Sequence, residues 1–115
     1  MSVEKIIHEH LTKKNVPVFF TGQATGEVLV PRVVIKVDQT SKFNDLSTTL
    51  SLYDILCYVP LNKGSTLSEF ALTIKEYMKE LQPAIMPTYF ETAPFLDPTI
   101  QGHMTSIQYR NYKKI

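Results

Sequence analysis

The sequence predicts an α+β domain in which two helices pack on a mostly antiparallel sheet. Two segments, residues 2–15 and 66–81, repeat apolar residues at the three- and four-residue spacing of a helix. Between and after them, segments rich in β-branched residues alternate apolar and polar positions, which is typical of strands. A chain of 115 residues suffices for a single domain, residues 1–115, whose core needs neither a metal nor a disulfide.

The N-terminal helix is expected over residues 2–15. Ser2 is available as its N-cap, and Pro17 prevents the helix from continuing. His8 and His10 lie two residues apart, so they point to different sides of the helix and cannot chelate one ion together. We interpret both as solvated surface histidines.

Three strands are expected between the helices, over residues 16–21, 32–38 and 47–60. Pro17 indicates that the first is an edge strand or begins there, because proline lacks the donor that a central strand needs. Residues 39–45 are polar and predict a loop. The second half of the 47–60 segment is apolar on both faces, which predicts a central strand covered on both sides in that part.

The central helix is expected over residues 66–81. Thr66 and Glu69 have the spacing of a capping box, and Pro83 stops the helix. An apolar seam runs along it, formed by Leu67, Phe70, Ile74, Tyr77 and Leu81 and widened by Ala71 and Met78. We expect this seam, with Ile74 at its centre, to pack on the sheet.

The C-terminal third begins with a proline-rich segment, residues 83–98. It favours an extended chain with a short strand at residues 88–92 and carries two apolar pairs, Tyr89-Phe90 and Phe95-Leu96. A domain of this size has little left to cover them, so we predict that they contact other proteins. The last strand, residues 102–110, places Ile107 and Tyr109 on one face and Arg110 on the other.

Residues whose side chains could take part in catalysis or metal binding are scattered along the chain. The single cysteine, Cys57, lies in an apolar run and is interpreted as a core residue of a protein in a reducing compartment. His103 could act as a base for Cys57, and Asp54 as an acid or base, but neither has a visible set of partners. The sequence has no glycine-rich phosphate loop and no zinc spacing. We therefore expect no catalytic, cofactor-binding or metal-binding residues and no enzymatic activity.

Charge and hydropathy exclude further classes. Twelve basic and eleven acidic residues give a net charge of +1, with no basic stripe before Arg110, Lys113 and Lys114, so specific nucleic-acid binding is disfavoured. No apolar run approaches the ~18 residues of a membrane span, and the N-terminus lacks a signal-peptide pattern. The expectation is a soluble protein without a membrane partner.

In length and element order the chain resembles the tail terminator, or tail completion, proteins of long-tailed bacteriophages. The local cues are residues 30–35 (VPRVVI), 53–59 (YDILCYV) and the ending at residues 96–110 (LDPTIQGHMTSIQYR). The resemblance covers nearly the whole chain, and it carries no catalytic fingerprint. The short lysine-rich end departs from the family and leaves a tail-plugging extension without support.

The resemblance implies a structural protein, made in the bacterial cytoplasm, in the tail or neck of a virion or phage-like particle. It implies a homohexameric ring on the last ring of tail-tube protein, which ends tail polymerisation and offers a surface to the head connector. The alternatives are another neck or head–tail joining protein, or a small ligand-binding or enzymatic α+β domain with a pocket between the central helix and the sheet. The residues we expect at interfaces are Phe43, Tyr89, Phe90, Phe95, Tyr109, Arg110 and Tyr112.

Overall fold

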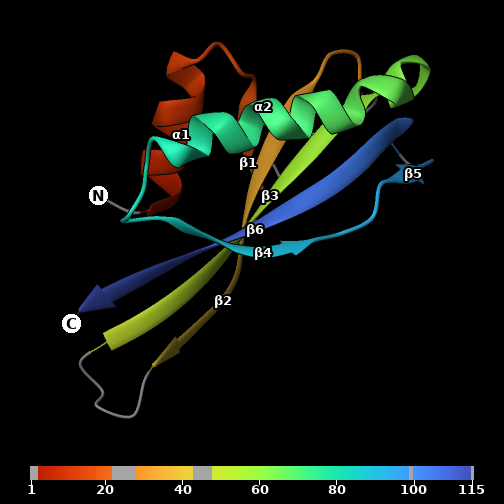
Figure 1. Cartoon of the computed structure of the whole chain (residues 1–115). Helices are drawn as coiled ribbons and strands as arrows, with labels where there is room; N and C mark the ends of the chain where they lie inside the picture. Colours follow the sequence, from red (N-terminus) through yellow and green to blue (C-terminus); the bar gives the residue numbers. More distant parts are fainter. Residues whose placement is uncertain (1–2, 22–27, 43–47, 99, 115) are drawn as a thin grey trace.

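The structure is a computed structural model that describes residues 3–21, 28–42, 48–98 and 100–114. Figure 1 shows the elements in chain order, which are α1 (Val3–Lys13), β1 (Val18–Phe20), β2 (Arg32–Lys42), β3 (Thr48–Pro60), the 3-10 helix η1 (Leu61–Thr66), α2 (Leu67–Lys79), β4 (Met86–Glu91), β5 (Phe95–Asp97) and β6 (Gly102–Lys114).

The described strands form one six-stranded sheet in the order β1-β2-β3-β6-β4, with β5 beside β6 on the same edge as β4. The β1–β2 pair is parallel and the other pairs are antiparallel. The two central strands, β3 and β6, pair along their whole length, from Thr48 opposite Lys114 to Pro60 opposite Gly102. The predicted α+β class with a mostly antiparallel sheet is confirmed, and the edge position expected for the first strand is also found.

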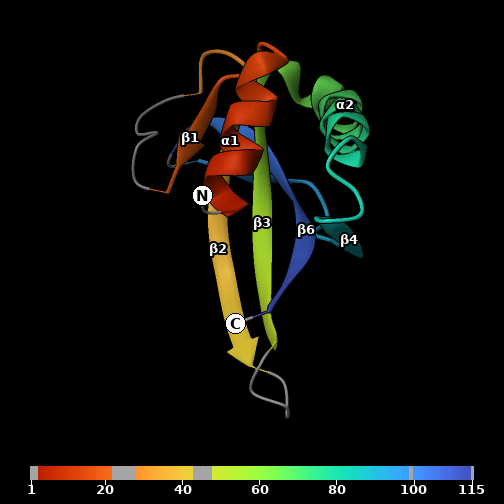
Figure 2. The ribbon, with the colours of Figure 1, turned by 90° about the vertical axis from the view of Figure 1, so that its left-hand side faces the viewer.

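The core lies on one face of the sheet. Alternate residues of β3, among them Ile55 and Cys57, are fully buried there against Ile7 of α1 and Ile74 of α2. Both helices therefore pack on the same face, as Figure 2 also shows. Each aliphatic side chain buried in this way contributes about 1.5–3 kcal/mol relative to an exposed one.

The other face of β3 is only partly covered. Leu52, Leu56 and Tyr58 point to it and are half-buried, and no described helix lies over it. The second half of the strand was expected to be covered on both sides, and this holds only in part, because Leu56 is half-buried on this face while its neighbours Val34 and Ser106 are buried. A leucine on the open face of a sheet looks the same in a sequence as one under a helix, because neighbouring side chains of adjacent strands already bury part of it.

The N-terminal helix is joined to α2 by polar contacts. Nε2 of His10 lies 2.8 Å from the carbonyl oxygen of Tyr77, and Lys14 Nζ lies 3.1 Å from Glu80 Oε1. His8 stacks on the ring of Phe20, with 4.7 Å between the ring centroids. Both histidines are half-buried, so the interpretation as solvated residues was wrong. Their partners are up to 67 residues away, a separation that local periodicity does not reveal.

The start of α2 also differs from the expectation. Thr66 makes no side-chain cap bond to the helix, and its hydroxyl instead donates to the carbonyl oxygen of Lys63 over 2.6 Å. The capping box with Glu69 is therefore absent. The reason is that η1 leads directly into α2, so Thr66 already has a helical backbone (φ −93°, ψ −3°) rather than the extended one of a cap. The predicted seam is present, with its buried positions at Leu67, Ala71, Ile74 and Met78. Phe70, Tyr77 and Leu81 are partly buried against the same core.

Three strands run beyond the part of the sheet that the helices cover. β2 continues through Lys42 where a loop at 39–45 was expected, with a bulge between Val37 and Gln39; positions 43–45 lie outside the described residues. Figure 1 shows the far ends of β2, β3 and β6 projecting from the helical layer. The molecule is accordingly elongated, at 49 × 25 × 24 Å.

Candidate interaction surface

The edge strand β4 contains a bulge. It pairs with β6 at Pro87 opposite Tyr109 and again at Glu91 opposite Ile107. Three residues, 88–90, thus face one residue of β6, and the surplus backbone must leave the plane of the sheet. Tyr89 at the centre of the bulge has φ 67°, in the left-handed region that a residue with a Cβ seldom occupies. We call Tyr89 and Phe90 the aromatic bulge.

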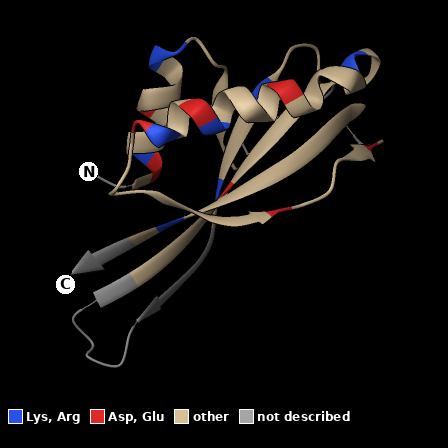
Figure 3. Ribbon diagram, viewed as in Figure 1, with Lys and Arg blue, Asp and Glu red and all other residues tan. Residues whose placement is uncertain are grey.

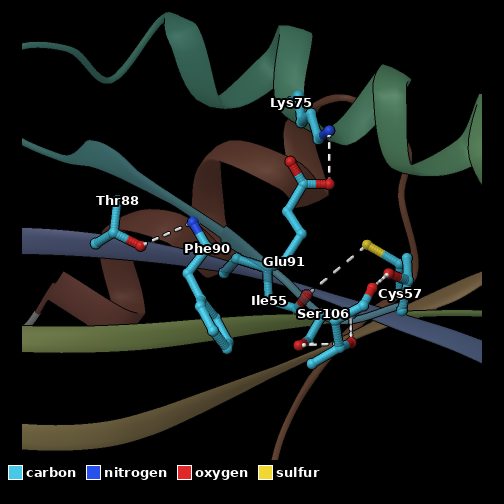
Figure 4. Close-up of polar contacts among 9 residues, drawn as sticks. Ile55, Cys57, Lys75, Thr88, Phe90, Glu91 and Ser106 are labelled. Carbon is cyan, nitrogen blue, oxygen red and sulfur yellow. Dashed lines mark hydrogen bonds and ion pairs between the residues drawn. The ribbon is translucent and has the colours of Figure 1, made fainter. Parts of the chain in front are cut away.

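Thr88 holds the bulge in place. Its Oγ1 donates to Oε1 of Gln108 on β6 over 2.8 Å and accepts the backbone N–H of Phe90 over 3.3 Å. Figure 4 shows this contact between Thr88 and the backbone nitrogen of Phe90. The bulge is therefore a fixed feature of the strand, and the two aromatic rings are presented on a braced backbone.

The segment after the bulge is fastened to β6 as well. Oγ1 of Thr92 accepts the N–H of Ser106 over 3.0 Å, and Thr105 donates its hydroxyl to the carbonyl oxygen of Thr92 over 2.7 Å. The three-residue strand β5 then pairs with β6, with Phe95 opposite Met104. The whole run from β4 to β5 is held along one edge of the sheet.

This edge is apolar and open to solvent. The exposed fractions are 82% for Tyr89, 61% for Phe90, 46% for Phe95 and 48% for Leu96. Figure 3 shows that charged residues are concentrated on the two helices, while β4 and β5 carry few. We call these four residues the apolar edge. The expectation that this patch stays uncovered within one domain is confirmed.

A groove separates the edge from α2. It has a volume of about 260 Å³ and is bridged by an ion pair between Lys75 and Glu91, with 2.7 Å between Nζ and Oε1. Figure 4 shows the two side chains extended toward each other from α2 and β4. The groove is lined by Lys75, Lys79, Gln82, Pro87, Tyr89, Glu91, Ile107 and Tyr109.

A second apolar surface, which the sequence did not indicate, lies at the end of the sheet. Leu29, Val30 and Leu61 are 76%, 55% and 47% exposed there. Leu29 and Leu61 border a groove of about 430 Å³ lined by Val28, Leu29, Pro60, Leu61 and Asn62, which we call the end groove. The residues before Arg32 have the composition of a segment that leads into a strand. The apolar residues of such a segment do not indicate which side chains face solvent.

The remaining predicted interface residues are placed differently. Tyr109 is buried in the core cluster, and burial raises the pKa of its hydroxyl. It is therefore a core residue in this chain, and its assignment to an exposed interface was wrong, because it shares the covered face with Ile107. Arg110 is half-buried on the opposite face, beside Leu52. Phe43 and the side chain of Tyr112 lie outside the part that the structure describes.

The candidate chemical groups are engaged in the fold. Burial raises the pKa of the fully buried Cys57 thiol to about 12, so it is protonated at neutral pH and not a nucleophile. Nε2 of His103 lies 3.2 Å from the carbonyl oxygen of Leu61, and its ring packs against Gly64. Asp54 is half-buried on the open face of the sheet, level with Lys36 and Gln108. The structure thus places Cys57 and Asp54 on opposite faces of β3.

Within the described ranges, no group of three or more His, Cys, Asp or Glu side chains is placed to hold a metal ion. Among those same residues, no helix has the length and apolar character to cross a membrane. The chain matches no protein-family model, and no curated protein shows significant sequence similarity to it. The apolar edge and the end groove are consequently the features on which a functional proposal can rest.

Proposed function

We propose that this chain is the subunit of a homo-oligomeric ring that caps the tail tube of a long-tailed phage or phage-like particle. The ring ends tube polymerisation and gives the surface that joins the tail to the head connector. The observation that carries the proposal is the apolar edge, four exposed apolar side chains on two braced strands. The resemblance to tail terminator proteins supplies the kind of assembly.

The size of the edge supports a protein interface. A buried aromatic contributes about 150–250 Å² of surface, so the three aromatic side chains at their exposed fractions offer roughly 400 Å², to which Leu96 adds. Monomers rarely keep apolar patches of more than a few hundred Å² unless these have a function. A standard interface covers about 800 Å² per partner, a little over half of it apolar. The apolar edge matches the apolar centre of one such interface.

The rigidity of the edge also supports association. Thr88 and Thr92 bind β4 and the following segment to β6 through their side-chain oxygens. Because the backbone is already ordered, little conformational entropy is lost when a partner covers the rings. A net charge of +1 adds little repulsion between identical subunits.

The experiment is native mass spectrometry of the parent protein and of Phe95→Asp, together with a tail-tube polymerisation assay. The parent protein should form a ring and arrest tubes at uniform length, while Phe95→Asp should be a folded monomer that leaves tubes of irregular length. Val37→Asp, at a 44% exposed position of β2, which β3 and β6 separate from β4 and β5, is the matched control and should behave as the parent. A parent protein that stays monomeric beside tail tubes would contradict the proposal.

A ligand-binding domain is the second candidate, favoured by the groove of about 260 Å³ between α2 and β4. It predicts a monomer that carries a small molecule in native mass spectra. A different neck protein would also form an oligomer but would coprecipitate with head-connector proteins and not with the tail tube. Native mass spectrometry and coprecipitation from one protein preparation therefore distinguish the three candidate functions.

A further inference from the structure

We propose that neighbouring subunits of the ring are joined head-to-tail, with the aromatic bulge of one copy seated in the end groove of the next. This inference rests on the proposed ring and adds the two surfaces that meet in it. The occupant of the end groove is thus a second copy of this chain.

The end groove is a built feature. The N–H of Val28 donates to the carbonyl oxygen of Ile100 over 2.9 Å, which ties the segment before β2 to the segment before β6. Val28 is buried against Gly102, where an added Cβ would lie 2.7 Å from Val28 Cγ2. This close approach fixes one wall of the groove, and the exposed Leu29 and Leu61 stand at its rim.

The bulge and the groove cannot meet within one chain. The bulge lies beside Gln108, whereas the groove lies where β6 begins at Gly102. Six residues of strand separate these positions, which is about 20 Å at ~3.3 Å per residue. A projecting patch and a receiving groove at different places on one molecule associate head-to-tail, and such contacts close into a ring when the rotation between copies permits.

The area favours a second copy over a foreign partner. By the same measure of 150–250 Å² per aromatic, the bulge offers on the order of 300 Å², and the exposed side chains of Leu29 and Leu61 at the groove add to this apolar area. Self-association covers both surfaces of every copy, whereas a foreign partner covers one. Together the two surfaces supply a large part of the apolar area of the smallest stable interfaces, which bury roughly 1,200 Å² in total, a little over half of it apolar.

Charge is consistent with the same occupant. The described residues that line the end groove are uncharged, and so are the two residues of the bulge. An apolar groove of this kind selects an uncharged projection and disfavours an acidic or basic segment, whose charge would lose hydration on entry. The bulge is the most exposed uncharged projection of the described chain, since Tyr89 has the largest exposed fraction among its large apolar residues.

The test uses two complementary variants, Phe90→Asp with a defective bulge and Leu29→Asp with a defective groove. Both positions are strongly exposed, so both variants should fold, which circular dichroism and melting curves check. Each variant alone should run at the monomer mass of 13.1 kDa. An equimolar mixture should form dimers of twice that mass and nothing larger, because one copy retains the groove and the other retains the bulge.

The possible results distinguish failure of the proposed ring from failure of the proposed contact between bulge and groove. If the parent protein forms rings and both variants still do, the ring stands and this inference is overturned. If only Phe90→Asp dissociates and the mixture gains no dimer, the bulges pair with each other by a two-fold axis, which also overturns it. A parent protein that is itself monomeric overturns the proposed ring, and the inference with it. Dimers in the mixture alone, with monomers in each separate sample, support the head-to-tail contact.

Discussion

A Cβ atom added to Gly64 would lie 2.6 Å from Nε2 of His103, closer than a Cβ atom approaches other heavy atoms in real structures. The absence of a side chain at Gly64 therefore lets the imidazole ring pack on η1, where its Nε2 lies 3.2 Å from the carbonyl oxygen of Leu61. This relationship ties the turn between β3 and α2 to the start of β6. It also gives His103 a structural role that does not involve chemistry.

Gly64→Ala should destabilise the parent protein, which has histidine at position 103, and should stabilise a variant with alanine at position 103. In the parent protein the methyl group displaces the ring and breaks a hydrogen bond that contributes about 0.5–1.5 kcal/mol. In a His103→Ala background the methyl group meets no ring, and the reduced freedom of the unfolded chain should stabilise the protein by about 0.4–1 kcal/mol. Urea unfolding of the four proteins in this cycle gives the coupling energy, and additive effects would show that the ring does not sense position 64.

The sequence was sufficient for the elements that periodicity defines. The alternation along β3 and the seam of α2 are visible because burial on one face dictates which residues are apolar there, and the structure places Ile55 and Ile74 in one core. The same rule could not tell an open sheet face from a covered one, as Leu52 and Leu56 illustrate.

The bulge and the end groove were beyond such reasoning. A backbone with positive φ is normally indicated by glycine, asparagine or aspartate, and Tyr89 gives no such signal. The two flanking pairings of β4 with β6 define the bulge, and pairing register is a long-range property. The end groove arises where Val28 meets Gly102, 74 positions later in the sequence, so its shape likewise depends on the assembled fold.

Ile74→Ala should lower the free energy of unfolding by about 2–5 kcal/mol, because the side chain is fully buried between α2 and the sheet and its removal leaves a cavity. Leu72→Ala is the matched control on the same helix, where the exposed side chain should change stability by no more than about 0.5 kcal/mol. Chemical denaturation of both variants measures the difference. Equal effects at the two positions would show that the core face of α2 is misassigned.

Stability should fall at alkaline pH in a way that depends on Cys57. Burial raises the pKa of this thiol from an ordinary value of 9.0 to about 12. Below pH 9 the thiol is protonated in both states, so its contribution to stability is fully present there. Between pH 9 and 12 only the unfolded chain releases the proton, and the free energy of unfolding falls by up to ~1.4 kcal/mol per pH unit.

Urea unfolding between pH 8 and 10 measures this slope, and Cys57→Ala should reduce it, leaving the part due to the buried tyrosines. Burial also raises the pKa of Tyr53, Tyr58 and Tyr109, but their ordinary value of 10.0 places their effect mainly above this range. A thiol-specific reagent should label the native protein at pH 8 only as fast as the protein unfolds. Rapid labelling of the folded chain would contradict the burial of Cys57.

Substitutions of Tyr89 should affect the stability of the monomer and the assembly of the oligomer differently. Its backbone has φ 67°, which costs a residue with a Cβ about 1–2 kcal/mol relative to glycine, partly offset by the greater freedom of glycine in the unfolded chain. Because the ring is almost wholly exposed, its loss alone should change the stability of the monomer little. Tyr89→Gly should therefore be more stable than Tyr89→Ala by about 0.5–1 kcal/mol.

Ring assembly should follow the aromatic group instead of the strain. Tyr89→Gly and Tyr89→Ala should both fail to form the oligomeric ring. Tyr89→Phe, which keeps an aromatic side chain on the same backbone, should assemble as the parent protein does. Thermal melting of the monomers and native mass spectra of the assemblies provide the two measurements. The strain at this exposed tyrosine adds nothing to the stability of the isolated chain, and the proposed contact with a neighbouring subunit would give it a role. If Tyr89→Gly assembled as well as the parent protein, the bulge would have no such contact, and its strain would need a different explanation.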